Sequence, residues 1–232
     1  MRRETQNILL VLLGGALLKL ALTGTYLRYV KASLQPWLVA TGAIMVLLAL
    51  VAIARDVRGK TAGHEGHEHT GRSPWLLLLP VLAVFLISPP ALGADTVNRS
   101  DRTIAQQNSA SGFAALPDEQ VVSLTMTDFV TRTAWDDSGS LDHRTVKLTG
   151  FVVQKDGNTF VARLAISCCA ADASPIKVRL LGGDLAALAD DQWVEVTGRV
   201  VPGSATKDTA YTPSFTVSAV TPVATPEDTY ES

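Results

Sequence analysis

Residues 145–169 read TVKLTGFVVQKDGNTFVARLAISCC and predict a β-hairpin. β-Branched and aromatic residues fill both arms, and KDGN at 155–158 contains the Asp-Gly dipeptide that favours a tight hairpin turn. From Val146 to Val152, every second residue of the first arm is apolar or glycine, which is the pattern of a strand with one face in a core. We therefore expect strands at 145–154 and 159–168.

The sequence that follows extends this pattern to an all-β domain. Further strand-like runs lie at 176–181, 192–201 and 214–223, separated by turn residues. Five short strands with such alternation are typical of a small barrel. The fold class that we expect for the C-terminal part is thus all-β, a five-stranded OB-like barrel domain at 118–224 followed by a tail at 225–232.

Two helical pieces are expected within this domain. Residues 121–135 fit a strand and then a short helix with Thr127 or Asp128 as its N-cap. Residues 185–189 fit a short helix that precedes the fourth strand. A domain of roughly 110 residues can hold its own core without disulfide bonds.

The first 94 residues have the composition of a membrane region. Apolar runs at 8–27, 36–54 and 75–92 each approach or reach the ~20 residues that cross a bilayer as a helix. We therefore expect an α-helical transmembrane region at 1–94 with three helices. A polar, Gly-rich and His-rich loop at 55–73 joins the second and third helices, and residues 95–117, which lack apolar periodicity, are expected to form a flexible linker.

The charges of the two parts have opposite signs. Residues 1–94 hold nine Lys/Arg and four Asp/Glu, whereas residues 95–232 hold eleven Lys/Arg and eighteen Asp/Glu, a net charge of −7. This acidity argues against a nucleic-acid partner, because phosphates are neutralised by basic surfaces. Six Lys/Arg flank the spans on the side of the N-terminus and only two on the other side, so the positive-inside rule places the N-terminus in the cytoplasm and the C-terminal domain outside.

The third apolar run has a second interpretation. Arg72, the apolar stretch after it and the small residues at 91–94 resemble a signal peptide with cleavage after Gly93. We favour an uncleaved span because two apolar runs precede it. Both interpretations export the C-terminal domain.

Cys168 and Cys169 are the only cysteines and lie side by side. If the strand at 159–168 continues through them, its period turns Cys168 toward the core and Cys169 toward the more polar face that carries Arg163. A disulfide between them is disfavoured, because neighbouring Cα atoms lie about 3.8 Å apart and disulfides need ~4.4 Å or more. Three hypotheses remain: a packed thiol with a neighbour at a strand end, a functional pair that binds a soft metal ion or switches to a strained disulfide, and pairing with another chain. Asp172 would either join the thiols as a ligand or cap the turn at 170–175.

The segment at 150–178, together with WVEVTGRV at 193–200, resembles the YcgQ-like family of bacterial membrane proteins, whose members are described as permease subunits. The resemblance rests on a Gly-Phe-Val segment, an arginine before an apolar run, a Cys-Cys-Ala-Ala-Asp-Ala signature and a Trp-Val strand. These features lie at Gly150, Phe151, Val152, Arg163, residues 168–173, Trp193, Val194, Val196 and Gly198. The resemblance implies N-terminal transmembrane helices in the bacterial inner membrane, an extracytoplasmic C-terminal domain and a multi-span permease as partner. The third span and the His-rich loop are not matched residue by residue.

Two further features of the membrane region are candidate sites. HEGHEH at 64–69 brings together His64, His67 and His69, which would chelate a divalent metal ion or else belong to a solvated loop. Lys19 lies within the first apolar run, where a charge either contacts a partner, here the permease, or reaches the membrane interface.

The sequence contains none of the short catalytic motifs of nucleotide-binding, hydrolase or zinc-protease families. We therefore expect a non-enzymatic accessory subunit of a membrane permease, with an exported domain that interacts with the partner or a ligand. The alternative is an exported, thiol-dependent metal-binding or redox protein that uses Cys168, Cys169 and Asp172. Its cofactor would be a divalent or soft metal ion.

Overall fold

The computed structural model describes residues 3–58, 90–99, 113–183 and 185–231. The chain divides into two compact units, residues 1–90 and 91–232. In the first unit, α1 (Arg3–Leu22) is followed by two 3-10 turns, η1 (Thr25–Arg28) and η2 (Ala32–Leu34), and then by α2 (Gln35–Arg58). Helix α1 ends where Gly24 adopts a left-handed conformation, with φ of 75°.

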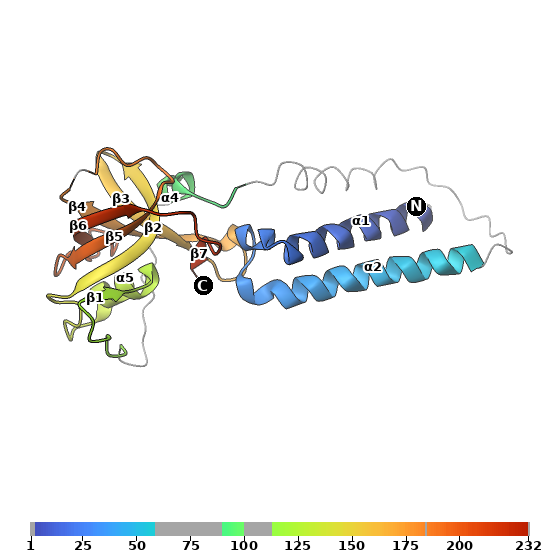
Figure 1. Cartoon of the computed structure of the whole chain (residues 1–232), viewed down its shortest axis with the longest axis horizontal. Coiled ribbons are helices and arrows are strands. Elements are labelled where there is room, and N and C mark those ends of the chain that lie inside the picture. Colours follow the sequence, from blue (N-terminus) through green and yellow to red (C-terminus); the bar gives the residue numbers. More distant parts are fainter. Residues whose placement is uncertain (1–2, 59–89, 100–112, 184, 232) are drawn as a thin grey trace. The chain divides into compact units, whose positions relative to one another are not determined.

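The two helices form an antiparallel hairpin (Figure 1). At one end the Gln35 side chain donates to the Ala21 carbonyl at 3.1 Å, and at the other the Asn7 amide donates to Asp56 at 3.5 Å. Glycines allow this approach, because a Cβ on Gly14 would lie 2.9 Å from the Gly42 carbonyl oxygen. Small residues at the crossing bring the two backbones close together, as in membrane helix pairs.

Among the described residues, one helix is long and apolar enough to cross a membrane. It spans Ala32–Arg58, 27 residues whose most apolar 18-residue stretch has a mean hydropathy of 2.5, and contains the second expected span at 36–54. The first expected span at 8–27 overlaps α1, whose apolar part, Gln6–Leu22, is shorter. The third expected span lies almost entirely outside the described residues. The expected loop at 55–73 begins later than predicted, because residues 55–58 still belong to α2, and its remaining residues lie outside the described ones.

The second unit is built on a mixed sheet that has seven strands in the described residues, in the order β1-β2-β5-β6-β4-β3-β7. Because β2 also pairs with β3, strands β2, β5, β6, β4 and β3 form a ring. The expected strands are all present. The strands are β1 (Val121–Ser123), β2 (Thr145–Lys155), β3 (Asn158–Ala165), β4 (Ser174–Leu181), β5 (Trp193–Val200), β6 (Ser214–Pro222) and β7 (Tyr230–Glu231). The prediction of a helix at 185–189 is wrong, since these residues form a turn.

Strand β2 closes the ring by changing partners along its length. Residues 146–151 pair with β5, and residues 151–155 pair with β3, both antiparallel. Gly150 lies at this change, and a Cβ there would come within 2.5 Å of the Ala162 carbonyl oxygen on β3. A side chain at this position would force the two strands apart.

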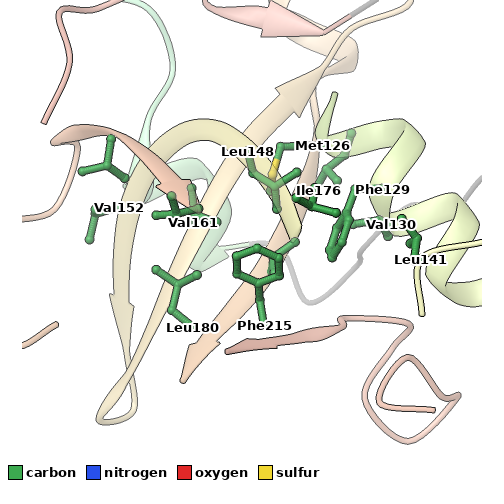
Figure 2. Close-up of a cluster of buried hydrophobic side chains, with 14 residues drawn as sticks. Met126, Phe129, Val130, Leu141, Leu148, Val152, Val161, Ile176, Leu180 and Phe215 are labelled. Atoms are coloured by element: carbon green, nitrogen blue, oxygen red, sulfur yellow. The ribbon is translucent and has the colours of Figure 1, made fainter. Parts of the chain in front are cut away.

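Helix α5 (Met126–Trp135) packs its apolar face onto the core that the ring surrounds (Figure 2). The Phe129 ring meets the Phe215 ring edge to face, with centroids 5.5 Å apart. The alternation predicted for β2 and β5 is confirmed, since Val146, Leu148 and Val152 on β2 and Val194 and Val196 on β5 are all fully buried. The N-cap of α5 is Thr125, whose hydroxyl accepts from the Asp128 N–H at 3.0 Å, and not Thr127 or Asp128 as expected.

A second apolar cluster covers the outer side of β2 and β3. It includes Ala94 and Val97 of the short helix α4 (Ala94–Arg99), a segment in which we expected the linker to begin. The Leu92 N–H donates to the Tyr230 hydroxyl at 3.1 Å, and the Ala94 N–H donates to Asp191 at 2.6 Å. The folded unit therefore includes residues 91–99, which carry too few apolar residues to show a period.

The expected tail at 225–232 ends in β7, which runs parallel to β3 and ties α5 to the sheet. The Glu231 carboxylate accepts hydrogen bonds from the N–H groups of Met126 and Thr127, both at 2.8 Å, at the start of α5. It also lies 4.0 Å from Nε of Arg163, and both side chains are 11% exposed. One carboxylate thus neutralises a buried guanidinium and satisfies two free amides of a helix end.

We predict that Glu231→Gln lowers the free energy of unfolding by about 2–4 kcal/mol, because it removes the carboxylate paired with Arg163 and weakens the helix cap. Glu227→Gln, at an exposed position before β7, is the matched control and is expected to change stability by less than about 0.5 kcal/mol. Pulse proteolysis of the full chain in detergent across a urea series measures the unfolding midpoint of each variant. Equal midpoints for the two variants would contradict the proposed role of Glu231.

Candidate functional site

The two cysteines lie in the turn that connects β3 to β4. Strand β3 ends at Ala165, and the 3-10 turn η4 (Ala170–Asp172) follows the cysteines. Our expectation that the strand continues through Cys168 is therefore wrong. Ile166, 5% exposed, is the last residue of this segment that reaches the core.

The Asp172 carboxylate ends the strand by folding the backbone around itself. It accepts hydrogen bonds from the N–H groups of Ser167, Cys168 and Cys169 at 2.7, 2.8 and 3.2 Å. These three amides are no longer available to a neighbouring strand, so the chain turns. The capping role that we considered for Asp172 is present in the structure.

Within this turn both thiols are free and near the surface. Cys168 is exposed and Cys169 is half-buried, so the expected inward direction of Cys168 is also wrong. The two sulfur atoms are 3.6 Å apart. One ligand atom from each of Cys168, Cys169 and Asp172 lies within 4.8 Å of the others, which is close enough for one metal ion.

The pKa values in the turn shift in opposite directions. The pKa of the Cys168 thiol rises from 9.0 to about 11, first through its hydrogen bond to Asp172 and then through that to Cys169. The pKa of Asp172 falls to about 2, first because Cys168 donates to it and then because of the Ser167 and Cys168 amides. Cys168 is therefore protonated at neutral pH, which makes it a poor catalytic nucleophile.

Arg163, on β3, lies near this turn in sequence but is directed elsewhere. Its guanidinium donates to the carbonyl oxygens of Asp228 and Tyr230, both at 3.1 Å, and stacks over the Trp193 ring at 5.0 Å. Burial lowers the pKa of Arg163, and the charge of Glu231 partly offsets this. The arginine fixes β7 against β3, and the β7 carbonyl of Glu231 in turn accepts from the Ile166 N–H at 2.9 Å, two residues before the cysteines.

Sequence analysis missed this support from β7, because a two-residue strand has no periodicity. The other candidate residues from the sequence lie outside the second unit. Lys19 is an exposed residue of α1, in the other unit. His64, His67 and His69 lie outside the described residues.

Comparison with protein-family models gives two matches. The DUF1980 N-terminal domain matches residues 5–101, and the DUF1980 C-terminal domain matches residues 101–231. These models cover nearly the whole sequence, so the chain belongs to the DUF1980 family. Searches of the curated proteins and of the solved structures found no match.

We predict that Asp172→Asn lowers the raised pKa of the Cys168 thiol toward its ordinary value, because the carboxylate no longer holds the proton on sulfur. The rate of iodoacetamide alkylation, measured against pH in a Cys169→Ser background, should then reach half its maximum at lower pH. Asp208→Asn, at an exposed aspartate outside this turn, should leave the profile unchanged. An unchanged profile for Asp172→Asn would show that the carboxylate does not control the thiol.

Proposed function

We propose that this member of the DUF1980 family is a non-enzymatic accessory subunit of a membrane permease. In this proposal the N-terminal helices anchor the protein in the bacterial inner membrane, and the β domain lies on the outer side. The permease partner is supported by the resemblance of residues 150–200 to the YcgQ-like family. Lys19 is the charged residue of the hairpin that we propose for contact with the partner.

The observation that carries the proposal is the apolar surface of the helix hairpin. Only 11% of the most apolar 18-residue stretch of the helix at Ala32–Arg58 is buried within the protein. Trp37 and Leu47 are 71% and 61% exposed, and further large apolar residues of α2 are exposed as well. Such a surface requires lipid or other apolar helices around it. The other large apolar residues of α2 that are exposed are Ile44, Leu48, Leu50, Val51, Ile53 and Val57.

The order of the strand ring supports an OB-like barrel for the exported domain. Within the ring β4 and β6 pair in parallel, while all other neighbouring strands are antiparallel. OB domains are binding modules that use one sheet face and the adjoining loops. The protonated Cys168 and the absence of catalytic sequence motifs favour binding over catalysis.

A photo-crosslinking residue at position 47 tests the partner. Leu47 is exposed on α2, whereas Ala49, two residues further along the same helix, is fully buried and serves as the control. We expect position 47 to crosslink to a multi-span membrane protein in cells and position 49 not to do so. Crosslinks from position 47 that contain only lipid or further copies of this chain would contradict the permease proposal.

The native cysteines test the orientation. Cys168 is exposed and should react with a membrane-impermeant maleimide. The reagent is added to reduced cells without their outer envelope, either intact or lysed. We expect the same extent of labelling in the intact and the lysed cells. Labelling that appears only after lysis would place the β domain in the cytoplasm. The low reactivity of the thiol affects both samples equally, so the ratio of the two extents is the measurement.

A further inference from the structure

The cysteine turn holds a chemical site that the permease proposal does not use. Cys168 is exposed and Cys169 is only half-buried, so neither thiol serves to fill the core. Two adjacent soft ligands beside a carboxylate form a donor set that thiophilic metal ions prefer. We propose that Cys168 and Cys169 bind one divalent, thiophilic metal ion with tetrahedral coordination, as Zn²⁺ has, and that Asp172 positions the pair.

The separation of the sulfur atoms selects the coordination geometry. With metal–sulfur bonds of ~2.3 Å, a distance of 3.6 Å between the sulfurs corresponds to a sulfur–metal–sulfur angle of about 103°, close to the tetrahedral value. An ion with two ligands in a line would need sulfurs ~4.6 Å apart. The pair as folded therefore suits a tetrahedral ion without rearrangement.

Backbone hydrogen bonds hold the two thiols in this arrangement. Besides the three amides bound by its carboxylate, Asp172 donates its own N–H to the Cys169 carbonyl at 3.0 Å. Before the cysteines, the bond from Ile166 to Glu231 fixes the chain to β7. A site whose ligands are already ordered loses less conformational entropy on binding.

The donor set and the proton balance are consistent with a divalent ion. A carboxylate has about four lone-pair positions, and Asp172 uses three for backbone amides and one for the Cys168 S–H. Binding exchanges two water ligands of the hydrated ion for two thiolates and releases both thiol protons to solvent, with no change of oxidation state. The Asp172 carboxylate keeps its three backbone hydrogen bonds when the Cys168 proton leaves, so it continues to hold the turn.

Two coordination positions of a tetrahedral ion remain for water or for donors from another molecule, because the turn supplies two sulfurs. The net charge of −7 on residues 95–232 attracts cations to the domain. An open, exposed position is the arrangement of a site that exchanges its ion, whereas structural zinc sites have four protein ligands.

Titration of the full chain in detergent with Co²⁺, followed by displacement with Zn²⁺, tests the site. The protein is reduced, freed of reductant, and carries His64→Gln, His67→Gln and His69→Gln so that the histidine tract does not contribute. We expect one Co²⁺ per chain with a sulfur-to-cobalt charge-transfer band, which Zn²⁺ removes. Cys168→Ser and Cys169→Ser should each weaken binding by more than about 100-fold, the upper end of the loss caused by removing an outer-shell partner.

The positioning role of Asp172 has its own variants. Asp172→Asn should retain the charge-transfer band but weaken binding by about 10–100-fold, whereas Asp208→Asn should bind as the parent does. A second measurement needs no variant in the turn: saturating Zn²⁺ should protect both thiols from alkylation. Absence of the band, unchanged affinity in both serine variants, no protection by Zn²⁺, or binding restricted to monovalent ions would overturn the proposal. None of these outcomes depends on whether a permease partner exists.

Discussion

The β domain depends on the double pairing of β2. This strand gives one stretch of its backbone to β5 and the next to β3, and only this exchange turns an open sheet into a ring. The exchange requires very close approach of β2 to β3 at Gly150, where the Ala162 carbonyl occupies the space of a side chain. Inward-facing valines and leucines on the ring strands, with the aromatic residues Phe129 and Phe215, then fill the enclosed volume. Hydrophobic burial stabilises the ring, but backbone geometry at one glycine permits it.

The ring also places the cysteine turn at the end of β3, where three sets of hydrogen bonds fix the backbone. The sheet fixes β3 as far as Ala165, β7 binds Ile166, and Asp172 binds the next three amides. The turn therefore has little freedom although it is exposed. The same carboxylate that orders the turn keeps the Cys168 thiol protonated, so order and low nucleophilicity have one cause.

Sequence patterns predicted the strands of the ring well, because β5 and the first half of β2 alternate and Asp156-Gly157 marks the hairpin. They failed where structure arises from single contacts between distant residues. The end of β3 at Ala165 depends on Asp172, the fold of residues 91–99 depends on Tyr230 and Asp191, and β7 depends on Arg163. At the candidate site, the sequence CCAAD is enough to predict that two thiols and a carboxylate lie close together. The exposure of Cys168 could not be predicted, because the alternation of side chains was extended along a strand that in fact ends at Ala165. The membrane assignment rests on composition and agrees with the apolar helix at Ala32–Arg58.

The parallel pairing of β3 with β7 has a consequence for the order of events during synthesis. Tyr230 and Glu231 leave the ribosome on the order of several seconds after Arg163 at ordinary translation rates. During that interval the arginine has no counter-charge from Glu231, the start of α5 lacks its acidic cap, and the cysteine turn lacks the bond at Ile166. The nascent domain therefore passes through a stage in which its two thiols are attached to an unfinished sheet. Oxidants and proteases that reach the chain at this stage meet the unfinished form before the native one.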